Sequence, residues 1–208
     1  MSADRAATAN VLGAVALAVA DQIRVTVAPA GGRSDSAAAA LSALYHFPGH
    51  LTVDQLCQVL GLTHSGAVRL VDRLTGAGLV QRAPGADRRS RSVRLTAAGR
   101  RTAHRVSDRR IAYLTSLLAD FSTAETGALR ELLGRVMSRV VQYKRDGAWI
   151  CRMCDLQACG RDAGNCPAAN AAALDRLEEQ AGISGTCESV STHADYPFMP
   201  LRLAYELA

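Results

Sequence analysis

The sequence predicts a mainly α-helical fold that carries one small β-hairpin. The hydrophobic fraction of 49% is supplied largely by Ala, Leu and Val, while aromatic residues make up 4%, a composition typical of close-packed helices. Apolar residues recur at helical spacing through most of the chain. One stretch, residues 79–95, instead alternates on either side of a turn. We therefore expect packed helices with a single hairpin, or wing.

Residues 4–28 are expected to form a long helix, and residues 36–46 a shorter one. A continuous apolar stripe runs along the long helix through Leu12, Val15, Val19, Ile23 and Val27. Apolar side chains cover more than half of its surface, so it needs burial on two sides, against its own domain and against a partner subunit. Residues 29–32 are predicted as a loop, and Ser34 or Asp35 as the N-cap of the shorter helix.

Residues 51–76 predict two short helices joined by a tight turn. Thr52 and Thr63 are suitable N-caps, and Gly61 stands where a C-cap glycine is expected. The inward faces are predicted to carry Val53, Leu56, Cys57, Val59 and Leu60 in the first helix and Val68, Val71 and Leu74 in the second. This leaves exposed, on the second helix, His64, Ser65, Gly66, Ala67, Arg69 and Arg73. Small polar residues backed by arginines at the start of a second helix suit insertion into a DNA major groove.

The predicted wing follows directly. Gly76 and Gly78 break the second helix, residues 79–80 begin a strand, and residues 84–87 form a turn before a returning strand. Its tip carries Asp87, Arg88, Arg89, Ser90 and Arg91. Because guanidinium groups are rarely buried without a partner, this hairpin is not a core element. Beside a recognition helix, its arginines would reach DNA phosphates and the adjacent minor groove.

The stretch from residue 51 to residue 99 closely resembles the winged helix–turn–helix of the MarR-type transcriptional regulators. The likeness is carried by LTVDQLCQVLGLT, RLVDRL and GLVQR, and then by Asp87, Arg89, Val93, Leu95, Thr96 and Gly99. The resemblance implies that Arg89 enters the minor groove and that Asp87 orients the wing. It places on the DNA-binding surface Thr63, His64, Ser65, Ala67, Arg69, Arg73, Arg88, Arg89 and Arg91. It also implies a homodimer on double-stranded DNA and a small-molecule effector.

Two long helices are expected after the wing, over residues 97–120 and from Ser122 or Thr123 onward. One side of the last helix carries Leu129, Leu132, Leu133, Val136, Met137, Val140 and Val141. About half of these apolar residues must belong to the core of the single chain. The two long helices nevertheless resemble the dimerisation bundle of the family, which also includes the N-terminal helix. A symmetric pair of recognition helices reads a pseudo-palindrome. The predicted segments are an N-terminal dimerisation helix, a winged domain, dimerisation helices and a cysteine-rich extension with tail, namely residues 1–33, 34–99, 100–147 and 148–208.

The extension contains a second informative motif, Cys151, Cys154, Cys159 and Cys166, spaced C-x2-C-x4-C-x6-C. A C-x-x-C pair places two thiolates on one metal, and the other two cysteines would complete a tetrahedron. Thiolates select zinc or an iron–sulfur cluster over hard cations, and zinc is the first expectation. An iron–sulfur cluster would make the protein a redox or iron sensor. Metal-free thiols would allow a switch through disulfide formation.

The other cysteines and the tail carry weaker signals. Cys57 is expected to be a small core residue, and Cys187 or His193 a spare ligand at most. The tail from residue 189 to residue 208 is apolar enough that we expect it to pack on a neighbour.

Net charge and motif content narrow the function classes. A net charge of +5 is compatible with a polyanionic partner. The apolar run at residues 11–20 is short of the ~20 residues that span a bilayer, so we expect a soluble, cytoplasmic protein. A thiol oxidoreductase is disfavoured because no βαβ pattern precedes the C-x-x-C pair, and no other catalytic set stands out, so an enzyme is not expected. Residues proposed to line an effector pocket are Arg24, Tyr45 and His46.

Overall fold

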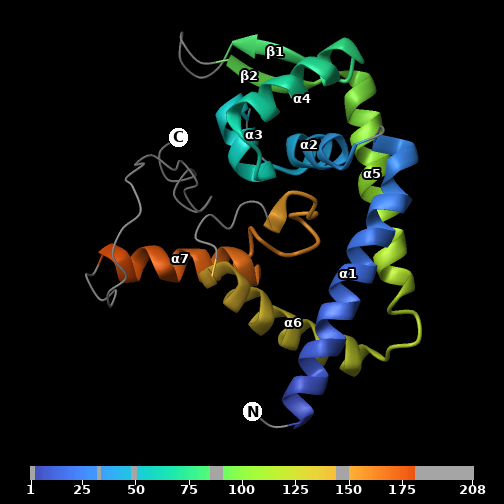
Figure 1. Ribbon diagram of the computed structural model, residues 1–208, viewed down its shortest axis with the longest axis vertical. Coiled ribbons are helices and arrows are strands. Elements are labelled where there is room, and N and C mark those ends of the chain that lie inside the picture. Colours follow the sequence, from blue (N-terminus) through green and yellow to red (C-terminus); the bar gives the residue numbers. More distant parts are fainter. Residues whose placement is uncertain (1–2, 32–33, 48–50, 85–90, 144–149, 181–208) are drawn as a thin grey trace. The chain divides into compact units, whose positions relative to one another are not determined.

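The computed structural model describes residues 3–31, 34–47, 51–84, 91–143 and 150–180 (Figure 1). The chain divides into two compact units. The first comprises residues 1–127 and 148–154, and the second comprises residues 128–147 and 155–208. The elements of the first unit are α1 (Ala3–Gly31), α2 (Asp35–His46), α3 (Val53–Leu60), α4 (His64–Gly76), β1 (Val80–Pro84), β2 (Arg91–Leu95) and α5 (Ala97–Ser116). This mainly helical architecture with one two-stranded sheet confirms the predicted fold class.

Side-chain caps set the helix starts where the sequence predicted them. The hydroxyl oxygens of Ser34, Thr52, Thr63 and Thr96 each accept a hydrogen bond from the backbone N–H three residues later. At α3 the cap is reciprocal, since the Gln55 side chain also accepts the Thr52 backbone N–H at 2.9 Å. These local contacts place the start of every helix that frames the winged domain.

The wing is an antiparallel pair in which Val80 lies opposite Leu95 and Pro84 lies opposite Arg91. The residues that lead into α3 add to its edge, because Thr52 forms an isolated antiparallel bridge with Ser92. The segment that leads into α3 is thereby hydrogen-bonded to the wing, since the Val93 N–H donates to the Leu51 carbonyl at 2.8 Å.

The core of the first unit is built around α2, which packs against α1, α3, α4, α5 and β2 (Figure 1). Its alanines permit close approach of the neighbouring helices, and residues 38–43 are all buried. Around it lie the buried side chains of Leu56, Val59, Leu70, Val71, Leu74, Val80, Val93 and Val106. α2 therefore contacts α4 as well as the long helices α1 and α5.

Two predicted boundaries and one helix face differ from the structure. The loop expected at residues 29–32 is helical as far as Gly31, because packing of Val27 and Ala30 carries the last turn of α1 past Pro29. α5 was expected to run to about residue 120 but ends at Ser116. At this residue the Ser116 hydroxyl donates to the Tyr113 carbonyl at 2.7 Å and so competes with the backbone hydrogen bonds of the helix. The buried face of α4 carries Ala67, Leu70, Val71 and Leu74, whereas Val68 is half-buried.

α1 is more apolar over its full length than the ten-residue run suggested. Among the described residues it is the one helix that by length and composition could cross a membrane, with a mean hydropathy of 1.6 and 6% of its best window buried. The core helix of a soluble protein and an N-terminal signal sequence can have the same length and composition, so this finding alone does not assign α1 to a membrane. The exposed apolar side chains of α1 need another explanation.

The second unit contains most of α6 (Thr123–Tyr143) and α7 (Pro167–Gln180). The two helices approach closely, since a Cβ added at Gly134 would lie 3.5 Å from the Pro167 Cβ. Residues 155–166, which precede α7, form hydrogen-bonded turns that include Gly160 and Gly164, both with positive φ. Residues 181–208, including Cys187 and His193, lie outside the described residues.

Candidate nucleic-acid interface

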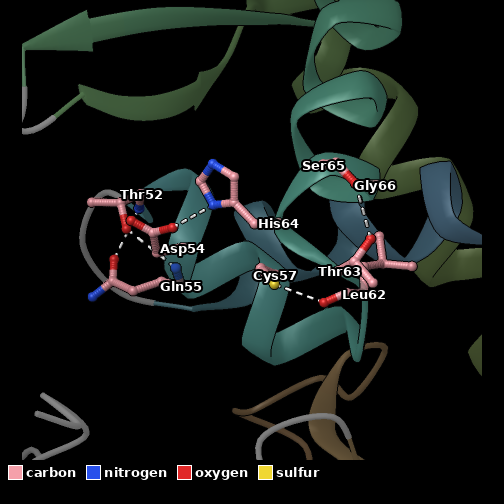
Figure 2. A network of polar contacts seen from close by, with 9 residues as sticks. All are labelled: Thr52, Asp54, Gln55, Cys57, Leu62, Thr63, His64, Ser65 and Gly66. Carbon is pink, nitrogen blue, oxygen red and sulfur yellow. Dashed lines mark hydrogen bonds and ion pairs between the residues drawn. The ribbon is translucent and has the colours of Figure 1, made fainter. Parts of the chain in front are cut away.

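The turn between α3 and α4 is held by several backbone and side-chain bonds (Figure 2). Gly61 adopts the left-handed conformation, with φ of 64° and ψ of 35°, that a C-cap requires. The Leu62 N–H donates to the Cys57 carbonyl at 3.0 Å, and the Cys57 thiol donates back to the Leu62 carbonyl at 2.7 Å. Burial, and then the Asp54 charge, raise the pKa of Cys57, so the thiol stays a donor. The turn therefore presents α4 at a fixed angle to α3.

The N-terminal end of α4 offers a polar, exposed surface. Thr63, His64 and Ser65 are exposed there, and Arg69 and Arg73 are exposed further along the helix. Ala67 is not part of this surface. It is 0% exposed and belongs to the core, so its predicted place on the DNA-binding face is wrong. A one-residue error in helix phase, 100° around the axis, accounts for this difference.

Two acidic residues orient this surface, and the sequence analysis assigned neither to the site. The Asp54 Oδ1 lies 2.7 Å from the His64 Nδ1, which links α3 to the first residue of α4 (Figure 2). An Arg82 guanidinium nitrogen donates to the Asp72 Oδ1 at 2.6 Å, which links β1 to α4. Asp72 and Arg82 stand within the RLVDRL and GLVQR motifs, so charge complementarity between those motifs was the available signal. For Asp54 no sequence signal existed, because its contact with His64 depends on the angle between α3 and α4.

The wing tip is only partly described. Arg91 opens β2 and is exposed, as expected of a phosphate-contacting arginine. Asp87, Arg88 and Arg89 lie outside the described residues, so their assignments stay predictions.

The base of the wing is joined tightly to α5. The Thr96 hydroxyl donates to the Gly78 carbonyl at 2.7 Å, and the Thr96 N–H donates to the Leu79 carbonyl at 3.0 Å. The Gly99 N–H in turn donates to the Thr96 hydroxyl oxygen at 3.0 Å. These hydrogen bonds join the start of α5 to the segment that links α4 and β1.

Comparisons with known proteins agree with this geometry. Residues 32–90 match the family model described as MarR family. PecS from Dickeya dadantii (strain 3937), an HTH-type transcriptional regulator, is 34% identical over 98 residues, which are 47% of this chain. The chain spans 59% of the length of PecS in that match.

Solved structures extend the likeness beyond the matched motif. A MarR family protein from Bacillus stearothermophilus superposes with a TM-score of 0.59 and 25% identity, covering 68% of this chain and 99% of that one. The chain has the winged-helix fold of the MarR-type proteins. RV1404 from Mycobacterium tuberculosis gives a TM-score of 0.53 with 26% identity, covering 67% of this MarR-type chain and 95% of its own. The cysteine-rich extension is not part of the family match, which ends at residue 90.

The residues expected to line an effector pocket in this MarR-type chain are not brought together. The Arg24 Nε lies 3.2 Å from the Asp35 Oδ2, at the N-terminal end of α2. Tyr45 and His46 lie at the opposite end of α2, roughly 15 Å away at 1.5 Å rise per residue. There the His46 Nε2 is 2.9 Å from the Ser107 Oγ of α5, and the Tyr45 ring contacts the His104 ring edge-on. His46 and Tyr45 therefore tie α2 to α5, while Arg24 ties α1 to α2.

The four cysteines of the extension are divided between the two compact units. Cys151 and Cys154 belong to the first unit and are joined by a turn in which the Cys154 N–H donates to the Cys151 carbonyl at 2.9 Å. Cys159 and Cys166 belong to the second unit. Within the described part of the chain, no group of three or more His, Cys, Asp or Glu side chains is arranged to hold a metal ion. The metal site therefore stays a prediction from the spacing of the four cysteines in the sequence.

Proposed function

We propose that this MarR-type chain is a DNA-binding transcriptional regulator that acts as a homodimer on a pseudo-palindromic operator in the cytoplasm. One observation carries the proposal: the N-terminal end of α4 is exposed, capped by Thr63 and backed by Arg69 and Arg73. Recognition helices read base edges in the major groove with this end. The ion pair between Arg82 and Asp72 joins the wing to α4, and in this proposal the wing contacts the adjacent DNA backbone.

Dimerisation is supported by large apolar side chains that the single chain leaves exposed. They lie on α1, on and after α5, and on α6 and include Val11, Leu12, Val15, Leu17, Val25, Ile111, Leu117, Phe121, Leu132, Leu133, Val136 and Val140. Soluble monomers rarely expose so many apolar residues on neighbouring turns. A second copy of the chain would cover them and would place two recognition helices symmetrically on DNA.

The test is selection of binding sites from random double-stranded DNA by the purified full-length chain. We expect a palindromic site, with affinity that falls steeply with salt. Arg69→Ala and Arg89→Ala should each lower the salt slope by about one, because each removes one positive charge from the proposed DNA-binding surface. Arg130→Ala, at an exposed position of α6, is the matched control and should leave the slope unchanged. Failure to enrich any site would contradict the proposed function.

We further propose that the cysteine module binds a metal, with zinc preferred and an iron–sulfur or thiol-based redox sensor as the alternative. The hydrogen-bonded C-x-x-C turn supports this, since it sets two sulfur atoms three residues apart on one tight turn. The left-handed Gly160 and Gly164 let a short segment bend around an ion. In the metal-bound state all ligating cysteines are thiolates.

Elemental analysis and an absorbance spectrum of anaerobically purified protein decide between these alternatives. About one colourless zinc per chain would indicate a structural site, and iron with sulfide would indicate a cluster-based sensor. Cys154→Ser should lose the metal and lower the melting temperature, because metal binding contributes to folding. Cys57→Ser, outside the module, should keep the metal. A Cys154→Ser protein with full metal content would contradict the four-ligand site.

A small-molecule effector is the remaining part of the proposal. The α2–α5 junction at His46 and Ser107 is a contact that an effector would need to alter in order to move the wing. An effector should raise the melting temperature and, because it binds the free and the DNA-bound chain with different affinities, should also change DNA affinity by reciprocal linkage. If every stabilising compound leaves DNA binding unchanged, the effector proposal fails while the DNA-binding proposal stands.

A further inference from the structure

The His64–Asp54 pair stands at the point where the recognition helix would enter DNA. His64 is the first residue of α4, and Asp54 comes from the first turn of α3. Their Nδ1 and Oδ1 atoms are 2.7 Å apart, and both side chains are largely exposed, by 67% and 76%. Figure 2 shows the second ring nitrogen of His64 directed away from Asp54. One nitrogen of the imidazole is thus engaged within the protein and the other is presented outward.

Such a pair contributes little to folding, because exposed ion pairs are screened by water and cost side-chain entropy. The pair has a larger effect on which imidazole nitrogen carries the proton. A carboxylate can only accept hydrogen bonds, so the proton of the neutral ring resides on Nδ1. The outward Nε2 then carries a lone pair and acts as an acceptor.

We propose that Asp54 is a positioning residue and that His64, through Nε2, accepts a hydrogen bond from the exocyclic amino group of an adenine or a cytosine. This rests on the proposed DNA-binding function and names what that site reads. In the major groove, the amino donors are adenine N6 and cytosine N4. The Asp54 carboxylate beside the ring would repel a phosphate, which favours a base edge as the partner. The Thr63 cap accepts the Gly66 N–H at 3.2 Å, so this backbone donor is not left for a phosphate either.

The chain contains a matched control for this pair. On α5 the His104 Nδ1 lies 2.7 Å from the Asp108 Oδ2, with exposures of 59% and 58%. Distance, atoms and solvent exposure are nearly the same, but this pair is on neither the recognition helix nor the wing. Asp108→Asn therefore makes the same chemical change as Asp54→Asn away from the proposed base-reading surface.

The experiment compares sites selected from random DNA by wild type, His64→Ala, Asp54→Asn and Asp108→Asn. We expect the wild-type site to prefer adenine or cytosine at one position of each half-site. His64→Ala should lose that preference by roughly tenfold and keep the others. Asp54→Asn should move it toward guanine, because an asparagine amide that donates to Nδ1 turns Nε2 into a donor for guanine N7 or O6. Asp108→Asn should match wild type.

Tautomer state is a second readout that a merely structural role would not move. The nitrogen-15 resonances of His64 should report a proton on Nδ1 in wild type and a change in Asp54→Asn, with no change in Asp108→Asn. All variants should melt at the wild-type temperature.

The outcomes separate this inference from the function on which it rests. If wild type selects no site, the DNA-binding function fails and this inference fails with it. If wild type selects a site and His64→Ala retains every base preference, DNA binding stands and the role of His64 is overturned. If Asp54→Asn alters neither the selected bases nor the tautomer, the positioning role of Asp54 is overturned.

Discussion

Gly99 occupies the first turn of α5, where no side chain can be accommodated. A Cβ added there would lie 1.8 Å from the Leu79 carbonyl oxygen, which is held in turn by the Thr96 N–H. Because this obstacle is backbone, the wing base and α5 would have to separate. We expect Gly99→Ala to lower the free energy of unfolding by about 1–3 kcal/mol, measured by urea denaturation. Gly76→Ala is the control, since nothing lies within 4 Å of the added Cβ, and it should be neutral or stabilising by up to ~1 kcal/mol. Equal losses in the two variants would contradict the close approach.

The roles of some residues could be predicted from a local sequence pattern, whereas the roles of others depend on how the helices pack. The caps Thr52, Thr63 and Thr96 were predictable, because each acts on a backbone N–H three residues away. Asp54 was not predictable, because its partner depends on the angle between two helices. The predicted exposure of Ala67 was wrong for a related reason. A small residue fits either face of a helix, so only its larger neighbours indicate which face is buried.

The start of α6 is an element whose stability should depend on pH. The Ser122 N–H and hydroxyl donate to the Glu125 Oε2 at 2.9 and 2.7 Å, and the Glu125 N–H donates to the Ser122 hydroxyl oxygen at 3.3 Å. These bonds, the hydroxyl first, lower the pKa of Glu125 below its ordinary value of 4.5. A lowered pKa in the folded state means that the stabilisation is present above 4.5 and is lost as the pH falls through the folded value.

We therefore expect Glu125→Gln to reduce the difference in free energy of unfolding between neutral pH and the acid range below 4.5. Urea unfolding monitored by circular dichroism measures this difference. Glu131→Gln, in the middle of the same helix, is the control and should retain the wild-type profile. If Glu125→Gln and wild type lose stability in parallel on acidification, the hydrogen bonds between Ser122 and Glu125 do not stabilise α6.

The extents of whole elements were predicted well where local signals set them and less well where packing did. The strands β1 and β2 and the helices α2, α3 and α4 follow turn and cap residues that the sequence displays. The end of α1 does not, because Val27 and Ala30 pack into a cluster with Ala38 and Val106 that only the folded chain creates. Met153 of the cysteine-rich extension packs against the same cluster, a contact that no periodicity could reveal.

The molecule as a whole presents α1 in a form that a single soluble chain does not explain. Leu17 is 70% exposed and Val25 is 65% exposed, yet by length and composition the helix could cross a membrane. A homodimer and a membrane association make opposite predictions about solubility. Burial against a second copy leaves the protein soluble without detergent, whereas membrane association places it in the pelleted fraction.

We expect the wild-type chain to sediment as a soluble dimer without detergent. Leu17→Asp should weaken dimerisation by roughly tenfold or more, because a carboxylate would be buried without a partner. Helix content by circular dichroism should be retained, since Leu17 is exposed in the single chain. Gln81→Asp, which adds the same charge on exposed β1, should remain dimeric. A wild-type chain that requires detergent would assign α1 to the membrane, and a Leu17→Asp chain that remains fully dimeric would move the dimer interface away from Leu17. Because two recognition helices bind a palindrome only when joined, loss of the dimer should also lower operator affinity, which links the exposed face of α1 to the DNA-binding function.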